Sequence, residues 1–251
     1  MVSVDGEPHV VPAPRVRTLL DLVREMVASS PDRLAIDADD GQLTHAELFD
    51  AARALAGRLR RLRIGPGDRV GVHVPSEAVA LYVAILGVLH AGAASVPVDA
   101  GDPPARAAAI WEQAHAVVVI EPGLALRELR APTGSDRSVS ADDEAWVIFA
   151  SGSSPRPAGV AVTHAAAVAF VEAGAGAGEV TAHDRVLAAA PNGFDASHAE
   201  MWIAWRVGAV LVPAPRSLAL GGSERRRWLV ERRVNVVLET PRLQAQSITP
   251  E

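Results

Sequence analysis

Strand-like and helix-like patterns alternate along most of this 251-residue chain, and the alternation limits the folds that it can adopt. Short apolar runs typical of buried strands are separated by segments whose apolar residues recur every three or four positions, as on one face of a helix. Strands joined through helices need crossover connections, which are right-handed and leave the strands mostly parallel. Strands are expected at 34–37, 42–43, 69–74, 94–98, 117–120, 145–150, 160–162, 185–190, 210–213 and 234–238. The sequence therefore predicts an α/β fold of mostly parallel sheets flanked by helices.

Capping signals indicate where several of the intervening helices begin and end. Thr44 stands three residues before Glu47, which is the spacing of a capping box. Ser76 and Thr163 are expected to cap two further helices, and Gly92 is expected to end the first of these two. Helices are expected at 16–28, from 44 to about 65, and at 76–91, 103–114, 163–173, 198–207 and 223–233.

The chain is expected to consist of a short tail and one folded region. Residues 1–15 are rich in proline and valine without periodicity, which predicts a flexible tail. Residues 16–251 form the folded region, and the polar segment 121–144 is the best position for a boundary between subdomains. Thr240 and Pro241 resemble the start of another helix only ten residues before Glu251, so the chain is expected to be truncated within its fold.

The basic residues are unusual, because all 24 of them are arginine and the chain has no lysine and no cysteine. This composition excludes Schiff-base catalysis, a lysine-dependent phosphate loop, a cysteine nucleophile, thiolate zinc sites and disulfides. The eight histidines form no H-x-H or H-x-x-x-H pair, so no metal site is expected. Any function that needs an ammonium group on a side chain at a fixed position is lost.

Charge and hydropathy restrict the partners and the location that are expected. The net charge of −6 is unlike that of a nucleic-acid-binding surface, which is normally basic. The longest apolar stretch, 78–98, is interrupted by Gly87, His90 and Gly92, which makes it a poor membrane span. Residues 1–14 lack the basic and apolar segments of a signal peptide. We therefore expect a cytoplasmic protein with no nucleic-acid or membrane partner.

The most informative segment is Trp146–His164, with the sequence WVIFASGSSPRPAGVAVTH. A buried strand leads into a loop of small residues, and a second strand leads to a capped helix. Small residues allow backbone amides and hydroxyls to close around phosphate oxygens, although Ser/Gly loops are also common without such a function. The candidate phosphate-binding residues are Ser151, Gly152, Ser153, Ser154 and Gly159.

This segment resembles the phosphate loop of the AMP-forming adenylating enzymes, whose pattern is S-G-[ST]-T-G-x-P-K-G. Two positions depart from the pattern, because Pro155 stands in place of glycine and Ala158 in place of lysine. Proline has no N–H to donate and a fixed φ, and alanine removes a cation. Arg156 is nearby but at a different position. The resemblance therefore implies a degenerate nucleotide site, at which ATP and magnesium bind weakly at best.

A second segment, Leu81–Asp102, is similar to the helix, glycine and strand that end in P-[ILV]-D in the same enzymes. Its role there is packing, and its apolar residues are expected to lie in the core. Trp202 and Trp205, one helical turn apart, are also expected to be core residues.

A third segment, Phe194–Trp202, is similar to the F-D-x-S-x-x-E motif of amino-acid-activating adenylation domains. The resemblance implies that Asp195 pairs with the ammonium group of an amino acid, and that Ala196 and Ala199 line its pocket. An amino acid is therefore favoured over an aryl or fatty acid as the substrate. The alternative is that Asp195 or Ser197 only caps a helix that begins near His198.

Together the three motifs imply the N-terminal part of a nonribosomal peptide synthetase adenylation domain, with the N-terminal subdomains of the adenylating-enzyme fold. The family's adenine, magnesium and ribose segments and its C-terminal lobe, with a second lysine, match nothing before Glu251. The expected protein resembles an ATP-dependent ligase but is inactive alone, and serves as a scaffold for pathway proteins or for its own copies. One alternative is half of a split ligase completed by a second chain, and another is a fragment of a longer protein.

Overall fold

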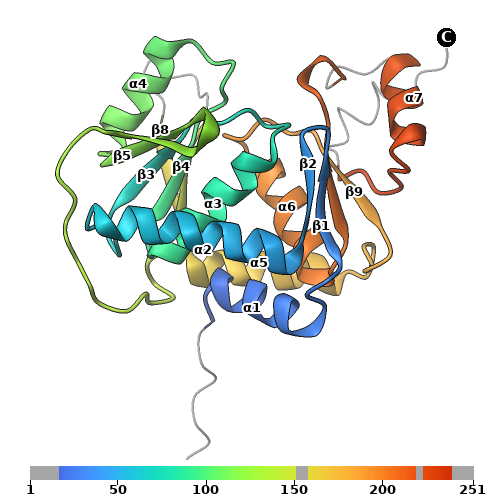
Figure 1. Cartoon of the computed structure of the whole chain (residues 1–251), viewed down its shortest axis with the longest axis horizontal. Helices are drawn as coiled ribbons and strands as arrows, with labels where there is room; N and C mark the ends of the chain where they lie inside the picture. The colour runs from blue at the N-terminus through green and yellow to red at the C-terminus, as the bar shows by residue number, and fades with distance from the viewer. Residues whose placement is uncertain (1–16, 151–157, 219–222, 239–251) are drawn as a thin grey trace, which may run out of the picture.

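The computed structural model describes residues 17–150, 158–218 and 223–238 (Figure 1). The expected tail, 1–15, and the expected helix start at Thr240 lie outside them. In chain order the helices, strands and 3-10 turns (η) are α1 (Leu19–Ser29), β1 (Leu34–Ala38), β2 (Gly41–Thr44), α2 (His45–Arg61), β3 (Arg69–Val72), α3 (Val79–Ala91), β4 (Ala94–Pro97), α4 (Pro104–Gln113), β5 (Val118–Glu121), η1 (Pro122–Leu124), β6 (Ala125–Glu128), β7 (Glu144–Ala150), β8 (Ala158–Thr163), α5 (His164–Gly176), β9 (Arg185–Ala188), α6 (Asp195–Val207), β10 (Val210–Pro213), η2 (Arg216–Leu218) and α7 (Ser223–Glu231).

The strands form two sheets, which confirms the α/β fold with mostly parallel strands. One sheet has the order β2-β1-β10-β9, and the other has the order β6-β5-β3-β4-β7-β8. Within the described ranges, neighbouring strands are parallel except in the pairs β1–β2, β5–β6 and β7–β8. Each antiparallel pair consists of strands consecutive in sequence, and its outer strand lies at a sheet edge.

A helical layer lies between the two sheets and gives them a common core (Figure 1). Helix α3 is buried at every position from Leu81 to Ala91, because it lies in the centre of this layer. One cluster of buried apolar residues includes Ile36 of β1, Val70 of β3 and Trp202 of α6. The outer face of the larger sheet is covered separately by α4. The core therefore extends across both sheets.

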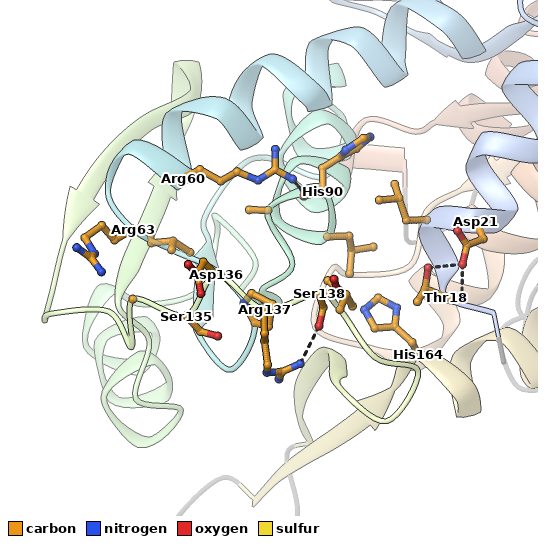
Figure 2. A pocket seen from close by; sticks show the side chains of 18 of the residues that line it. Thr18, Asp21, Arg60, Arg63, His90, Ser135, Asp136, Arg137, Ser138 and His164 are labelled. Carbon is orange, nitrogen blue, oxygen red and sulfur yellow. Dashed lines mark hydrogen bonds between the residues drawn. The ribbon is translucent and has the colours of Figure 1, made fainter. Parts of the chain in front are cut away.

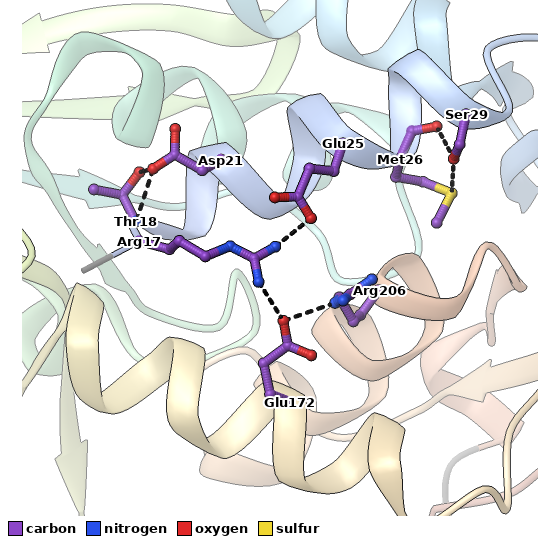
Figure 3. A network of polar contacts seen from close by, with 8 residues as sticks. All are labelled: Arg17, Thr18, Asp21, Glu25, Met26, Ser29, Glu172 and Arg206. Carbon is purple, nitrogen blue, oxygen red and sulfur yellow. Dashed lines mark hydrogen bonds and ion pairs between the residues drawn. The ribbon is translucent and has the colours of Figure 1, made fainter. Parts of the chain in front are cut away.

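An ion-pair network joins α1 to the helices beneath it (Figure 3). Arg17 Nη1 lies 3.0 Å from Glu172 Oε1 on α5, and Arg206 Nε on α6 donates to the same oxygen at 3.1 Å. Arg17 also pairs with Glu25. Because these side chains are partly exposed, each pair is expected to contribute at most about 1 kcal/mol to stability.

Most of the predicted helix signals are confirmed. Thr44 Oγ1 accepts the Glu47 N–H at 3.2 Å while Glu47 Oε2 accepts the Thr44 N–H at 2.8 Å, which completes the capping box of α2. Thr163 Oγ1 caps α5 through the Ala166 N–H. Gly92 ends α3 with φ +92°, a left-handed conformation that favours glycine. The expected core tryptophans, Trp202 and Trp205, are both buried.

The expected cap at Ser76 is wrong. Helix α3 begins three residues later, at Val79, and the side chain of its N-cap residue Ala78 has no hydrogen-bonding group. The Ser76 carbonyl instead accepts the Tyr82 hydroxyl at 3.1 Å, and its own hydroxyl donates to Glu77. The Val79 N–H at the start of α3 donates instead to Asp40 Oδ1, between β1 and β2, at 3.1 Å, so a carboxylate distant in sequence caps this helix.

Two segments differ from the strand and loop pattern that was predicted. The polar segment 121–144 contains η1 and β6, and β6 pairs with β5 although its side chains are mostly exposed. Backbone pairing at an exposed edge needs no apolar pattern. The strands on either side, β5 and β7, belong to one sheet, so the sheet order gives no support to a boundary within 121–144. At 234–238 only a single bridge forms, between Val186 and Val236.

Among the described residues, none of the helices combines the length and the hydropathy that crossing a bilayer requires. The apolar stretch at 78–98 is divided between α3 and β4 by Gly92.

Candidate functional site

The carboxyl ends of the parallel strands form the edge at which α/β proteins usually bind ligands. In the larger sheet, β3, β4 and β7 end at this edge, and β7 leads directly to residue 151 of the expected phosphate loop. In the smaller sheet, β9 ends at Ala188 and leads through a turn to Asp195 at the start of α6. The two motifs singled out in the sequence are therefore both attached to the carboxyl ends of parallel strands.

The turn between β9 and α6 is held by polar contacts on two sides. Asn192 is buried, and its Nδ2 donates to the Val74 carbonyl at 3.1 Å, just beyond β3. Glu200 is 3% exposed and accepts the N–H groups of Ala189 and Ala190 at 3.2 and 3.1 Å. These bonds fix the turn against the larger sheet, and with it the position of Asp195.

Asp195 is the first residue of α6, and its side chain is exposed. It forms no hydrogen bond or ion pair with any other residue that the structure describes. The N-cap residue is Phe194, without a side-chain bond, and the Ser197 hydroxyl donates to the Phe194 carbonyl at 2.7 Å. The alternative that Asp195 or Ser197 caps a helix starting near His198 is therefore wrong. The carboxylate is stabilised by the helix dipole and remains available to a cation.

Ala196 and Ala199 are near the start of the same helix, where Ala199 is half-buried. A cavity of about 20 Å³ lies between α3 and α6, and neither alanine nor Asp195 is among its lining residues. Such a volume holds about one water molecule. This small cavity is therefore not an amino-acid pocket, and the substrate-binding roles of Asp195, Ala196 and Ala199 remain predictions.

His198 connects α6 to the strand that carries the expected phosphate loop. Its ring is buried and lies against Trp146 of β7, with ring centroids 4.3 Å apart and an interplanar angle of 37°. Burial lowers the pKa of His198 to about 4, so the ring is neutral at pH 7. This contact was not predicted from the sequence, because a single histidine carries no sign of the strand that it faces.

The expected phosphate loop is described only at its far end. Ser151, Gly152, Ser153 and Ser154 lie outside the described residues, as does Pro155. Gly159 belongs to β8 and pairs with Phe149, and a Cβ at this position would lie 2.8 Å from Phe149 Cζ. Glycine at 159 is therefore explained by packing, and its phosphate role remains a prediction. Ala158, which stands in place of the family's lysine, is exposed at the start of β8.

An ion pair that was also not predicted links the two sheets at this edge. Asp99 follows β4 and is buried, and it pairs with Arg216, which follows β10. The Gly101 N–H donates to the same carboxylate at 2.8 Å. Asp99 is the aspartate of the P-[ILV]-D pattern. This match was the only sign in the sequence of a role for Asp99.

Comparison with known proteins agrees with the motifs. The family model for AMP-binding enzymes matches residues 23–138 and 123–247. The chain is 33% identical over 246 residues to the phosphinothricin tripeptide synthetase PhsC of Streptomyces viridochromogenes, and the match covers 90% of this chain and 22% of PhsC. It is 35% identical over 228 residues to the isonitrile lipopeptide synthase of Streptomyces coeruleorubidus, with 83% of this chain and 15% of the synthase covered.

Solved structures show the same relationship. The N-terminal subdomain of NpsA from Klebsiella oxytoca, in complex with 3-hydroxybenzoyl-AMSN, has a TM-score of 0.75 and 25% identity over 92% of this chain and 61% of its own. The nonribosomal peptide synthetase FmoA3 has a TM-score of 0.74 and 30% identity over 89% of this chain and 25% of its own. This chain thus spans only part of each relative. It belongs to the AMP-binding enzyme family, and within that family it corresponds to an N-terminal adenylation region of a nonribosomal peptide synthetase.

Proposed function

We propose that this adenylation region is inactive by itself in forming aminoacyl-AMP and serves as an interaction element in a pathway to a peptide secondary metabolite. The observation that carries the proposal is Ala158. Its exposed position at the start of β8 offers no cation to the polyphosphate of ATP, and the chain contains no lysine that could replace the missing group. Phosphoryl charge in such sites is normally offset by fixed cations and N–H donors.

The interaction role is supported by apolar side chains on the surface. Val160 on β8, Phe170 on α5 and Phe194 before α6 are 57%, 46% and 52% exposed. In the proposed role these three side chains contact another protein surface or a second copy of the chain. The expected partners are other proteins of the biosynthetic pathway, and pull-down from an extract of the producing cells, followed by mass spectrometry, tests this expectation.

A split ligase is the second candidate, and the unpaired carboxylate of Asp195 favours it. A chain that retains this group at the start of α6, with no partner among the described residues, still carries the feature that would bind an amino-acid ammonium group. A second polypeptide would then supply the remaining nucleotide-binding residues and a lysine. Pro155 and Ala158 count against this candidate, because completion by another chain does not change them.

Amino-acid-dependent exchange of pyrophosphate into ATP distinguishes these functions. The isolated chain is expected to give no exchange above background with any of the common amino acids. Robust exchange by the chain alone would contradict the proposal. Exchange that appears only when a co-purified protein is added, and that is lost in Asp195→Asn, would establish the split ligase instead.

Cytoplasmic location belongs to the same proposal. Fractionation of the producing cells, with antibody detection of this chain, is expected to place it in the soluble fraction.

A further inference from the structure

A second cavity lies at the opposite edge from the candidate site, and it has a volume of about 700 Å³. Its wall includes Ile64, Gly65 and Pro66, which precede β3, and Ala91, which precedes β4. It therefore lies at the amino ends of these strands, whereas the candidate phosphate loop and Asp195 follow carboxyl ends.

The cavity is elongated, and its walls come from four parts of the chain (Figure 2). Thr18, at the start of α1, lies at one end and Arg63 at the other, with Arg60 between them on one wall. The loop that contains Ser135 and Ser138 forms the facing wall. A cavity of this shape suits an extended segment of polypeptide better than a compact ion.

Arg60 and Arg63 lie apart, and their guanidinium groups point in different directions along the cavity (Figure 2). Helix α2 ends at Arg61, and Arg63 has a left-handed conformation with φ +61°, so the chain turns out of the helix between the two side chains. Arg60 donates to the His90 carbonyl, and neither arginine forms an ion pair with a carboxylate of the described residues. Each guanidinium group therefore retains N–H donors for an anionic partner of its own.

Positive charge is in excess along the cavity. Arg24 pairs with Asp21 at 3.2 Å, and Arg137 pairs with Asp143 at 2.6 Å. Beside the two unpaired arginines, Asp136 on the facing loop is the unpaired acidic group of the wall. The net charge of −6 repels a long polyanion such as a nucleic acid, whereas a short acidic segment meets mainly the local charge, because charges beyond about 10 Å are screened.

The cavity also offers an apolar floor and free hydroxyl groups. Leu20, Ile64 and Leu89 line it and are buried. The hydroxyls of Ser135 and Ser138 form no hydrogen bond with another described residue. A peptide carries groups that match all three features of the wall: carboxylates for the arginines, apolar side chains for the floor and backbone carbonyls for the hydroxyls.

We propose that this cavity is the docking site for an extended acidic segment of a partner protein, with one carboxylate at Arg60, another at Arg63 and an apolar side chain over Ile64 and Leu89. A carboxylate accepts charge-assisted hydrogen bonds from a guanidinium group. Successive residues of an extended chain lie about 3.3 Å apart, so a few residues carry acidic side chains to separate points. The proposal rests on the interaction role stated above and gives the partner its chemistry, but it does not depend on the loss of adenylation.

Calorimetric titration of the full chain at low salt with the acetylated and amidated peptide EGLEGLE tests the proposal. The neutral peptide QGLQGLQ is expected to bind about fivefold or more weakly, because it makes no ion pair with either arginine. Citrate is expected to bind weakly as well, because its charges are concentrated in a compact molecule that does not reach both guanidinium groups. Citrate that binds as tightly as EGLEGLE would contradict the proposal.

Single variants test whether the two contacts are separate. Arg60→Gln and Arg63→Gln are each expected to lower the affinity for EGLEGLE by roughly two- to fivefold. Because each arginine contacts a different carboxylate, the two losses are expected to multiply in Arg60→Gln/Arg63→Gln. A double variant that binds no more weakly than either single variant would overturn the proposal.

Two further variants are controls. Arg58→Gln/Arg61→Gln removes the same charge from the same helix, at positions that do not line the cavity, and is expected to change the affinity by less than about twofold. Arg63→Gly removes the guanidinium group but places glycine at a left-handed position, so it is expected to bind as weakly as Arg63→Gln while unfolding at a higher urea concentration than the unaltered chain. A loss of binding is thereby separated from a loss of folding.

Equal losses in the two double variants would contradict the proposal, because they would indicate attraction to a general basic surface. Absence of EGLEGLE binding to the unaltered chain at millimolar concentration would also contradict it. If the pull-down captures pathway proteins while EGLEGLE does not bind, this docking site is wrong and the interaction role stands. Binding of EGLEGLE by a chain that also gives pyrophosphate exchange would support the docking site and overturn the proposed inactivity.

Discussion

Buried polar side chains near the start of α6 determine where its exposed carboxylate lies. Asn192 and Glu200 bond to backbone groups on either side of the turn, and His198 lies against Trp146. The motif indicates that Asp195 pairs with an ammonium group, and this role stays a prediction, since the structure shows only that its carboxylate is exposed and makes no capping contact. It carried no sign of the roles of Asn192 and His198, because burial of a single polar residue depends on elements that are distant in sequence.

Restoring the two departures in the phosphate loop is expected to strengthen nucleotide binding. Pro155→Gly returns an amide donor, and Ala158→Lys returns a cation at an exposed position, so the double variant is expected to bind ATP about tenfold or more tightly than the unaltered chain. Isothermal titration measures this difference. Ala158→Gln, which adds length without charge, is the control. Equal affinity for ATP in the unaltered chain, the double variant and Ala158→Gln would show that these positions do not limit nucleotide binding. Submillimolar affinity of the unaltered chain for ATP would show the same.

Three buried histidines make stability sensitive to mild acid. Burial lowers the pKa of His45, His90 and His198 to about 4 in the folded chain, whereas the unfolded chain protonates them near their ordinary value of 6.5. The unfolded state therefore takes up more protons as the pH falls from 6.5 towards 4, and the free energy of unfolding decreases. We expect roughly 1 kcal/mol per histidine for each pH unit in this window, measured by urea unfolding.

His198→Gln is expected to remove one of these contributions and flatten the pH dependence. His183→Gln, at a position outside the buried core, is expected to leave it unchanged. If the two variants lost stability in parallel with the unaltered chain between pH 6.5 and 4.5, burial of His198 would not be the cause.

At the scale of elements, the sequence predicted a helix end correctly where the residues that hold it lie within one helical turn. The capping box of α2, the Thr163 cap and the glycine at the end of α3 each involve residues within one turn, and all three are confirmed. The expected cap at Ser76 failed because the first N–H of α3, at Val79, donates to Asp40, which is distant in sequence. The edge strand β6 was missed because backbone pairing leaves no trace in hydropathy.

Removing the capping box is expected to destabilise the chain through α2 alone. Thr44→Ala leaves the Glu47 N–H without its acceptor, and the free energy of unfolding is expected to fall by about 1 kcal/mol. Chemical denaturation measures the change. Thr133→Ala is the control, because the Thr133 hydroxyl bonds to no other described residue, and its effect is expected to stay within about 0.5 kcal/mol. An equal change in both variants would mean that the cap contributes nothing.

At the scale of the whole molecule, the sequence was enough to predict the fold class but not the order of the strands. Hydropathy patterns record which residues are buried, whereas strand order depends on which strands meet, and β1 pairs with β10 across about 170 residues. The sequence likewise predicted only part of the candidate site. Its motifs were recognised, while the Asp99–Arg216 link between the sheets required the fold.

The common core predicts that the two sheets unfold together. Trp111 lies in the separate cluster on the outer face of the larger sheet, and Trp202 lies in the core between the sheets. Urea unfolding followed by fluorescence in Trp111→Phe and Trp202→Phe, and by circular dichroism, is expected to give one transition per protein that coincides between the two probes. Separate fluorescence and circular dichroism transitions in either variant would show that each sheet is an independent unit.

The pairing of β1 with β10 also affects how the chain folds during its synthesis. The ribosome releases β1 before β10, and the strand that covers its open side emerges only about 170 residues later. At about five to twenty residues per second this interval lasts roughly ten to thirty-five seconds. During that time the nascent chain carries an apolar strand, Leu34–Ala38, with one side unpaired. Chaperones that bind nascent chains and shield such segments are therefore expected to raise the yield of this protein more than that of chains whose neighbouring strands are consecutive.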